Sequence, residues 1–485
     1  MKGRQMRANF FSLRWLVAAI LIVGLAGMAG CDPDDEDQIF VLFRRPTPAP
    51  TTAPTRTPTR VPTPKPTATP KPTPTPSPAG TATPSPTPTL APEACLPSSS
   101  ISVLVAGTDA TAYVPDGRWG SSVTGVEVVP IETSSGIGTG GAVTTVGTPN
   151  SVNSCSSNSS TGQTVCTANN TDVYLITGST LGSTLTSGSN ATQGFSGGSC
   201  NNCGVVVDSS QNKALITMGF SPNGPGAYQF LDLGATPPVF EPPIPAGTAT
   251  TLQTTSEDAS IDPIRHLVLS PNEQGNYQIL DISAGTEKAK IFNNNVTGNP
   301  EFDSAGEDCT TGIALGTIEF TGDLFIADLT QATFDSATGT WSDTASQVQN
   351  FPEFAPLAAG TCGIAVAPGT HIGLVTGEFG GDVEGVIQLP ATSGTGVPAV
   401  VDWVQFTLPS QPDGTPFSLG FDPHTVTAYV SPNSGKPLGV LTSYSGGVPH
   451  FLAVADLNGL LAAPRTGHTV NTPLPPGLIT YVLVH

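Results

Sequence analysis

The feature that most constrains the fold of this chain is an internal repeat. SPNGPGAYQFLDL begins at Ser221 and SPNEQGNYQILDI begins 49 residues later, at Ser270. SPNSGKPLGVLTS at Ser431 is a weaker copy. In each copy an apolar strand precedes a Pro/Asn/Gly turn and an alternating strand follows it, which is the pattern of a β-hairpin. Such a period indicates repeated units that share one local structure.

Each copy is preceded by another short strand, which begins at Gly204, Ala259 or Ser418. The expected strands end at equivalent acids, which are Asp208, Asp262 and Asp422. Weaker copies elsewhere, including those at Cys309 and Cys362, bring the total to about seven units of about 40 to 50 residues. The 54 glycines and 48 prolines argue against long helices.

Repeats of this length and strand content predict an all-β fold, a β-propeller of about seven blades, with six to eight as the range. A β-sandwich or a solenoid is the main alternative. The strand LITYVLV, residues 478–484, is predicted to complete the first blade beside ISVLVAG, residues 101–107. That pairing would remove an open sheet edge.

The two best copies, residues 205–233 and 260–283, resemble the YVTN-like repeats of bacterial surface propellers. In those repeats an Asp-Pro turn, a Val-Tyr-Val-type strand and a Val-Ile-Asp strand recur. The resemblance is close in these two units and loose in the others. It therefore implies a shared fold more than a shared ancestry.

Residues 1–30 have the pattern of a secretory signal peptide, with four basic residues ahead of the apolar run Trp15–Gly30. This run is shorter than the roughly 20 residues that a membrane-spanning helix needs. Ala29, Gly30 and Cys31 resemble the bacterial lipobox, although Met28 stands where that motif usually has leucine. The resemblance implies that Cys31 is acylated and anchors the chain in the lipid bilayer. A plain signal peptide or an uncleaved anchor is the alternative.

Residues 31–94 form an acidic spacer followed by a Pro/Thr-rich linker, which is expected to be disordered. The acids that begin at Asp32 are interpreted as solvated residues rather than as a metal cluster. In lipoproteins, an aspartate at this position is associated with retention in the inner membrane. The linker is expected to be an extended stalk of polyproline II, with O-glycosylation and a Pro-rich recognition ligand as alternatives.

The predicted propeller domain, residues 95–485, is strongly acidic. It contains seven Lys and Arg against 31 Asp and Glu, a formal charge of −24. Nucleic-acid binding requires a basic surface, so this class of function is excluded. A cationic partner, metal ions or simple solubility are compatible with the charge.

Secretion permits disulfides, and three pairs are predicted. They are Cys155–Cys166, Cys200–Cys203 and Cys309–Cys362, with Cys95 left over. The second pair is a CxxC motif, for which redox activity and zinc binding are the alternatives. A strand-like segment follows it, whereas a redox-active CxxC requires a helix N-terminus.

Several acids are predicted at the mouth of the central channel, where a divalent cation such as Ca²⁺ would relieve their mutual repulsion. They are Glu257, Asp258, Glu307, Asp308 and Asp413. Gluconolactonase-like propellers, which this arrangement resembles, hold a divalent metal in such a place. The alternative is that these are solvated loop acids. The six histidines have no metal-ligand spacing, and neither a nucleophile elbow nor a nucleotide-binding motif is present.

These observations predict a lipoprotein of the bacterial cell envelope, with its propeller facing the periplasm or the exterior. We expect the propeller to be a non-catalytic binding or scaffold module for an envelope protein, a glycan or a small ligand. The alternative is a metal-dependent hydrolase or lactonase that uses the acids at the channel mouth. A subunit of an envelope assembly is a third hypothesis. Whether the protein is an enzyme stays open, because the fold by itself specifies no chemistry.

Overall fold

A computed structural model of the chain describes residues 101–117, 123–188, 201–218, 227–245, 258–272, 276–283, 290–292, 302–318, 323–331, 334–335, 340–341, 346–349, 361–377, 383–392, 398–419, 426–445 and 448–485. The chain divides into two compact units, Asp35–Pro88 and the remainder, and all described residues belong to the remainder. The predicted signal peptide, Cys31, the acidic spacer and the Pro/Thr linker lie outside the described residues.

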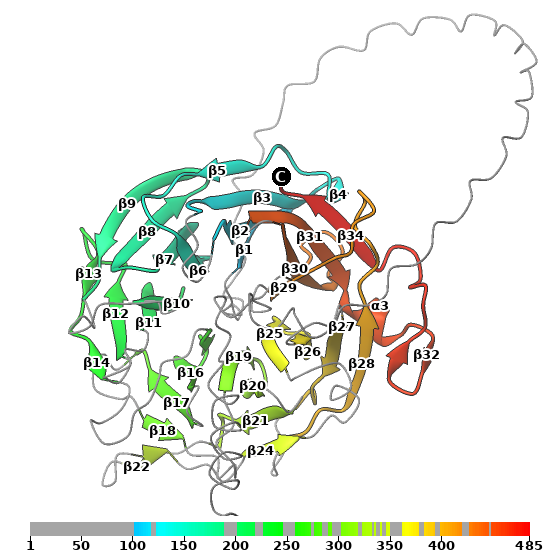
Figure 1. Ribbon diagram of the computed structural model, residues 1–485. Helices are drawn as coiled ribbons and strands as arrows, with labels where there is room; N and C mark the ends of the chain where they lie inside the picture. Colours follow the sequence, from blue (N-terminus) through cyan, green and yellow to red (C-terminus); the bar gives the residue numbers. More distant parts are fainter. Residues whose placement is uncertain are drawn as a thin grey trace, which may run out of the picture. The chain divides into compact units, whose positions relative to one another are not determined.

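Seven β-sheets follow one another along the chain and form a ring (Figure 1). This arrangement is a β-propeller and confirms the predicted all-β fold with seven blades. We number the blades in chain order. Blade 1 contains β1 (Ser102–Ala106), β2 (Asp109–Pro115), β3 (Val126–Thr133), β4 (Gly136–Ile137) and β5 (Thr144–Val146). Blade 2 contains β6 (Val152–Asn158), β7 (Gln163–Ala168), β8 (Asp172–Thr177) and β9 (Thr180–Thr186).

The next blades repeat the same antiparallel order. Blade 3 contains β10 (Asn202–Asp208), β11 (Lys213–Met218), β12 (Ala227–Asp232), β13 (Val239–Phe240) and β14 (Ile244–Pro245). Blade 4 contains β15 (Ser260–Asp262), β16 (Leu267–Asn272), β17 (Asn276–Asp281) and β18 (Lys290–Phe292). Blade 5 contains β19 (Phe302–Asp308), β20 (Ile313–Ile318), β21 (Leu324–Asp328) and β24 (Ser346–Gln349), with the separate hairpin β22 (Phe334–Asp335) and β23 (Thr340–Trp341).

The connection from β28 (Asp402–Thr407) to the first described strand of blade 7 runs over residues 408–425. Blade 6 contains β25 (Thr361–Ala367), β26 (Ile372–Gly377), β27 (Val383–Gln388), β28, β33 (Thr469–Val470) and β32 (Arg465–Thr466). Blade 7 contains β29 (Val426–Val430), β30 (Pro437–Ser445), β31 (Val448–Asp456) and β34 (Ile479–Leu483). The short helix α3 (Leu457–Leu461) follows β31, and the Asp456 side chain caps its start by accepting a hydrogen bond from the Gly459 N–H.

The hydrophobic core of the ring is divided into seven clusters, each of which fills the space between two neighbouring blades. Side chains alternate between the two faces of a strand, so one strand contributes to two clusters. Leu215 of β11 packs toward blade 4, for example, whereas the next residue, Ile216, packs toward blade 2. This explains why the central strands are nearly continuous apolar runs.

The first strand of a blade lies nearest the centre of the ring, as β1, β6, β10, β19, β25 and β29 show in Figure 1. Several of these strands are buried along their whole length and consist largely of small residues, as in VNSCSSN of β6 and TCGIAVA of β25. Small side chains allow neighbouring blades to approach closely. At Gly306 of β19, a Cβ atom would already lie 3.5 Å from Ile364 of blade 6.

The ring closes differently from the sequence prediction. The C-terminal strand β34 pairs with β31 as the outermost strand of blade 7, whereas β1 pairs with β2 alone. The prediction that residues 478–484 complete blade 1 was therefore wrong. Blade 1 already supplies its own outer strands, β4 and β5, and the connection after α3 returns the chain to the edge of blade 7.

Blades 1 and 7 are instead joined by side chains. Val482 and Val484 pack into the apolar cluster between these blades. The buried Glu132 of β3 accepts hydrogen bonds from the Tyr429 hydroxyl (3.0 Å), the Ser431 hydroxyl (2.6 Å) and the Asn433 amide (2.9 Å) of blade 7. Closure thus depends on apolar packing and on polar contacts, and the Glu132 carboxylate accepts three of the hydrogen bonds.

The third copy of the repeat occupies a different place in its blade from the one that the sequence predicts. The Ser-Pro-Asn at Ser270 lies at the junction of the second and third strands of blade 4. The Ser-Pro-Asn at Ser431 follows β29, the first described strand of blade 7, and leads to the second. The strand expected at Ser418 is absent from the described residues, and Asp422 lies outside them. The same turn residues are used in both places because Pro and Asn suit either turn.

Candidate functional site

The acids predicted at the channel mouth do not form one cluster within the described residues. Glu257 lies outside them. Asp258 precedes β15, and its carbonyl accepts a hydrogen bond from Ala305 N (2.9 Å), which lies three residues before Asp308 on β19. Glu307 and Asp308 are the last two residues of β19. Asp258 and Asp308 therefore lie at opposite ends of neighbouring inner strands.

Asp308 holds a turn and bridges two blades. Its Oδ1 atom accepts hydrogen bonds from the Thr310 N–H (3.2 Å) and hydroxyl (2.6 Å), while Oδ2 lies 2.5 Å from Nδ1 of His371 in blade 6. Asp208 is used in the same way, since it caps its own turn and lies 2.8 Å from Nδ1 of His266 in blade 4. Both aspartates are completely buried. These contacts are those of structural residues, which hold turns and join neighbouring blades.

The bridging side chains occupy one repeated position, four residues after the end of the inner strand. Asn212, His266 and His371 all have positive φ there, at 51°, 56° and 61°. Gly162 and Gly312 occupy the equivalent positions with positive φ. Asn and His tolerate this left-handed conformation better than most residues. An Asn, His or Gly at this spacing is a sequence signal that would have identified these turns.

Glu307 is a buried carboxyl group rather than an open ligand. Its Oε1 atom accepts a hydrogen bond from Leu269 N (3.2 Å), and the side chain belongs to a residue that is 4% exposed. Burial raises the pKa of the Glu307 carboxyl well above its usual range, and the nearby Asp262 carboxylate raises it further. Burial between the blades therefore favours the protonated form of Glu307.

We expect Glu307→Gln to stabilise the protein at alkaline pH and to have little effect at pH 4. The raised pKa means that folded Glu307 keeps a proton that the unfolded chain releases, so the wild type loses stability as the pH rises above about 4.3. The difference in free energy of unfolding should grow in favour of the variant by up to about 1.4 kcal/mol per pH unit. Urea denaturation at pH 4, 6 and 8 measures this difference.

The matched control is Glu241→Gln, which removes a half-buried acid that lies 3.6 Å from Lys213. At high pH the Glu241→Gln variant should not be more stable than the wild type, because the substitution removes the ion pair with Lys213. A Glu307→Gln protein that is less stable than the wild type at pH 8 would contradict the assignment.

Asp413 lies on the exposed loop between β28 and β29. Its Oδ1 atom accepts hydrogen bonds from the Thr415 N–H (2.9 Å) and hydroxyl (2.7 Å), and these bonds lower the pKa of Asp413. Oδ2 lies 3.9 Å from Nδ1 of His450. These contacts describe an ordered turn on the surface.

The cysteines follow the prediction in part. Cys155 and Cys166 form a disulfide across β6 and β7, as predicted. Cys203 is disulfide-bonded and lies in strand β10, and Cys200 lies outside the described residues. The predicted Cys309–Cys362 bridge is wrong, because Cys362 remains a buried thiol whose Sγ donates to Asp303 Oδ2 (2.6 Å).

The positions of Cys309 and Cys362 explain why they do not pair. Cys309 directly follows β19, whereas Cys362 is the second residue of β25. Thr310, which follows Cys309, lies near Gly369 at the far end of β25. A strand rises about 3.3 Å per residue, so the two cysteines are separated by most of the length of β25, whereas a disulfide requires Cα atoms within about 7 Å.

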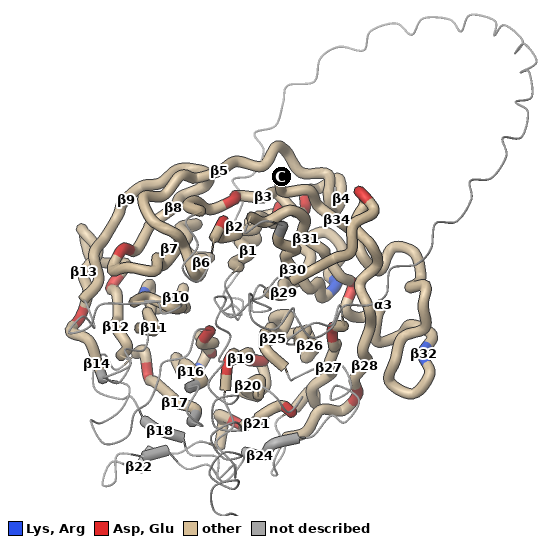
Figure 2. Tube along the Cα trace, in the orientation of Figure 1, with Lys and Arg blue, Asp and Glu red and all other residues tan. Residues whose placement is uncertain are grey.

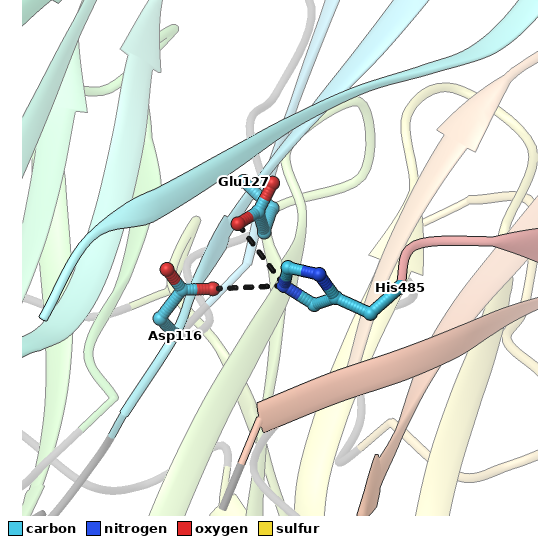
Figure 3. A group of neighbouring side chains, drawn as sticks. All are labelled: Asp116, Glu127 and His485. Atoms are coloured by element: carbon cyan, nitrogen blue, oxygen red, sulfur yellow. Dashed lines mark ion pairs between the residues drawn. The ribbon is translucent and has the colours of Figure 1, made fainter. Parts of the chain in front are cut away.

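A cluster that the sequence reasoning missed lies between blades 1 and 7 (Figure 3). Asp116 follows β2, Glu127 lies on β3, and His485 follows β34. The Nε2 atom of His485 lies 3.1 Å from Glu127 Oε1 and 3.8 Å from Asp116 Oδ1. The pairing of β2 with β3 places Asp116 near Glu127 within blade 1, whereas only ring closure brings His485 to these two acids.

The two acids of this cluster are buried, and the histidine is open to solvent. Asp116 and Glu127 are 4% and 0% exposed, whereas the side chain of His485 is 43% exposed. Burial and the neighbouring Glu127 raise the pKa of Asp116 to about 7, although His485 acts in the opposite direction. One imidazole and two carboxylates that face one another form a donor set suited to a divalent cation.

A separate groove of about 380 Å³ lies between blades 1 and 2. It is lined by Leu104, Thr111, Tyr113, Val128, Gly178 and Ser179, among others. Its size is sufficient for a small ligand. Within the part of the chain that the structure describes, no helix is both long enough and apolar enough to span a bilayer.

No protein-family model and no curated protein sequence matches this chain. Among solved structures, the chain is similar to the β-propeller domain of Cps50 (Swd1) from Myceliophteria thermophila. The identity is 9%, the TM-score is 0.46, and the match covers 73% of this chain and 95% of that domain. We draw no functional conclusion from this similarity, and the seven sheets themselves define the fold.

Proposed function

We propose that this protein is a lipoprotein of the bacterial cell envelope whose β-propeller is a non-catalytic binding or scaffold module. Its partner would be an envelope protein, a glycan or a small ligand. The observation that carries the binding role is the ring of seven blades, in which Asp208 and Asp308 hold turns and bridge blades. Asp308, one of the acids that suggested a catalytic site, thus has contacts typical of a framework residue.

The support for a scaffold role is rigidity. A hydrophobic cluster fills each space between blades, and polar bridges join several of the inner turns. Loops on such a frame are held in fixed relative positions before a partner arrives. Preorganised loops lower the entropy cost of binding.

The support for the kind of partner is charge. The Asp and Glu positions of the described residues are distributed around the ring, whereas Lys and Arg positions are few (Figure 2). With a formal charge of −24 over residues 95–485, the domain would repel an acidic partner. A neutral or basic partner surface is therefore favoured.

The support for the anchor is the sequence around Cys31. Cleavage before Cys31 and acylation of its sulfur would place the acids from Asp32 onward next to the membrane. The Pro/Thr tract, residues 46–92, would reach about 150 Å when extended as polyproline II. Such a tether would hold the propeller well away from the bilayer.

The hydrolase or lactonase alternative has weaker support. It relied on a shared mouth cluster, but Glu307 is buried with a raised pKa and Asp308 is engaged with His371. The groove between blades 1 and 2 is a further candidate surface for a small ligand within the binding role.

Photo-crosslinking in the source bacterium tests the anchor and the binding role together. A benzophenone amino acid is introduced into the full chain at Ser410, on the loop between β28 and β29, or at Thr161, on the turn between β6 and β7; both residues are exposed. We expect fatty-acid labelling, recovery in the membrane fraction and a discrete crosslinked partner from at least one of these sites.

Two controls separate the parts of this proposal. The same probe at Ser183, an exposed residue on the outer strand β9, should give no discrete product. Cys31→Ala should abolish labelling and release the chain from the membrane. Equal crosslinking from Ser183, or none from Ser410 and Thr161, would contradict the binding role, and an unlabelled Cys31→Ala chain that stays in the membrane would contradict the lipid anchor.

A further inference from the structure

The junction of blades 1 and 7 differs from an ordinary closed ring, because no described strand is shared across it. The cluster of Asp116, Glu127 and His485 spans this junction (Figure 3). The two acids belong to blade 1, and His485 directly follows the final strand of blade 7. A group bound by all three would connect the first blade to the last.

The donor atoms have the separations expected around a small metal ion. Nε2 of His485 lies 3.1 Å from Glu127 Oε1 and 3.8 Å from Asp116 Oδ1, and all three donor atoms lie within 4.8 Å of one another. Ligands bound tetrahedrally at about 2.0–2.2 Å from Zn²⁺ are about 3.4 Å apart. Small side-chain adjustments would therefore complete the coordination.

An independent observation also points to a ligand. The Oδ1 atom of Asp116 is buried and accepts no hydrogen bond from any described residue, and it is directed toward His485 (Figure 3). The Oε2 atom of Glu127 is likewise buried and accepts no hydrogen bond within the described part of the chain. Burying carboxylate oxygens without partners is costly, and a cation would compensate this cost.

The surroundings favour a defined site. The Thr145 hydroxyl donates to Glu127 Oε1 (2.8 Å), which orients this carboxylate as an outer-shell partner would. Gly125 has φ +138°, and a Cβ atom there would lie 2.4 Å from Asp116 Oδ2. A larger residue at position 125 would therefore displace the carboxylate.

We propose that Asp116, Glu127 and His485 bind one Zn²⁺ ion, which fastens blade 7 to blade 1. The imidazole distinguishes this site from a Ca²⁺ or Mg²⁺ site, because those hard cations prefer oxygen ligands alone. The solvent exposure of His485 supplies a path for the ion and leaves a fourth coordination position for water.

The test uses the purified full chain after chelator treatment and removal of the chelator. Isothermal titration with ZnCl₂ should give one binding event per chain, and Zn²⁺ should raise the melting temperature. Co²⁺ should give the strong visible absorption of tetrahedral coordination. His485→Ala and Asp116→Asn should each weaken Zn²⁺ binding at least about tenfold and remove the thermal shift.

The matched control is His450→Ala, because His450 is also partly exposed but, among the described residues, pairs with a single acid, Asp413, at 3.9 Å. It should bind Zn²⁺ as the wild type does. The side chain of His485 is 43% exposed, so its replacement leaves the core intact if Asp116→Asn does not fold. A wild-type chain without a binding isotherm or thermal shift would overturn the proposal, as would unchanged binding by His485→Ala or equal affinity for Ca²⁺.

Discussion

Replacing Glu132 by alanine is expected to lower the free energy of unfolding by about 4 kcal/mol. The buried Glu132 carboxylate accepts hydrogen bonds from Tyr429, Ser431 and Asn433 across the junction of blades 1 and 7. Hydrogen bonds to a charged group contribute about 1.5–3 kcal/mol each, and buried donors left without an acceptor add to the loss. Among the strands that the structure describes, none is shared across this junction to compensate. Urea denaturation measures the loss.

Two variants calibrate this result. Tyr429→Phe removes one of the three hydrogen bonds and should cost about 1.5 kcal/mol. Asp109→Ala removes an exposed acid of the same blade and should change stability by less than about 0.5 kcal/mol. A Glu132→Ala protein as stable as Asp109→Ala would show that the carboxylate does not hold the ring closed.

Gly316→Ala is expected to be the second severe substitution, with a loss of about 3 kcal/mol. A Cβ atom at position 316 would lie 1.6 Å from the hydroxyl oxygen of Tyr277 and 2.0 Å from its ring carbon Cζ. Tyr277 is fully buried and stacks on Phe325, with ring centroids 4.4 Å apart, and contacts Phe302 at 4.5 Å. The tyrosine ring therefore has no space to move away. Thermal and urea unfolding measure this loss.

The control for this prediction is Gly147→Ala, since a Cβ atom at Gly147 would meet no atom within 4 Å. It should leave stability within about 0.5 kcal/mol of the wild type. In a Tyr277→Leu background, Gly316→Ala should cost clearly less than it does alone, because the clashing ring is gone. Additive effects of the two substitutions would argue against the clash.

Much of the fold could be predicted from local patterns. The apolar run at Lys213 forms β11, and the segment at Ala259 contains β15. These identifications succeed because strand propensity, alternation and turn residues act over a few positions. The prediction for the third copy was wrong because it also relied on a few local positions. Ser-Pro-Asn at Ser431 suits the first turn of a blade as well as the second.

The candidate site was less accessible to sequence reasoning. Asp308 was recognised as a notable acid, but its partner His371 lies 63 residues away in the next blade. Glu307 was identified from its position beside Asp308, yet its burial between blades decides its chemistry. Burial and partner identity depend on how the blades pack, which no window of the sequence contains.

The sequence by itself determined the strands, their grouping into repeats and the acidic character of the domain, because these follow from composition and short-range periodicity. Only the tertiary structure decided that β34 belongs to blade 7, that Cys362 keeps its thiol, and that His485 meets Asp116 and Glu127. These outcomes join residues from the two ends of the domain. Their proximity arises when the ring closes, and it depends on the number and packing of all the blades between them.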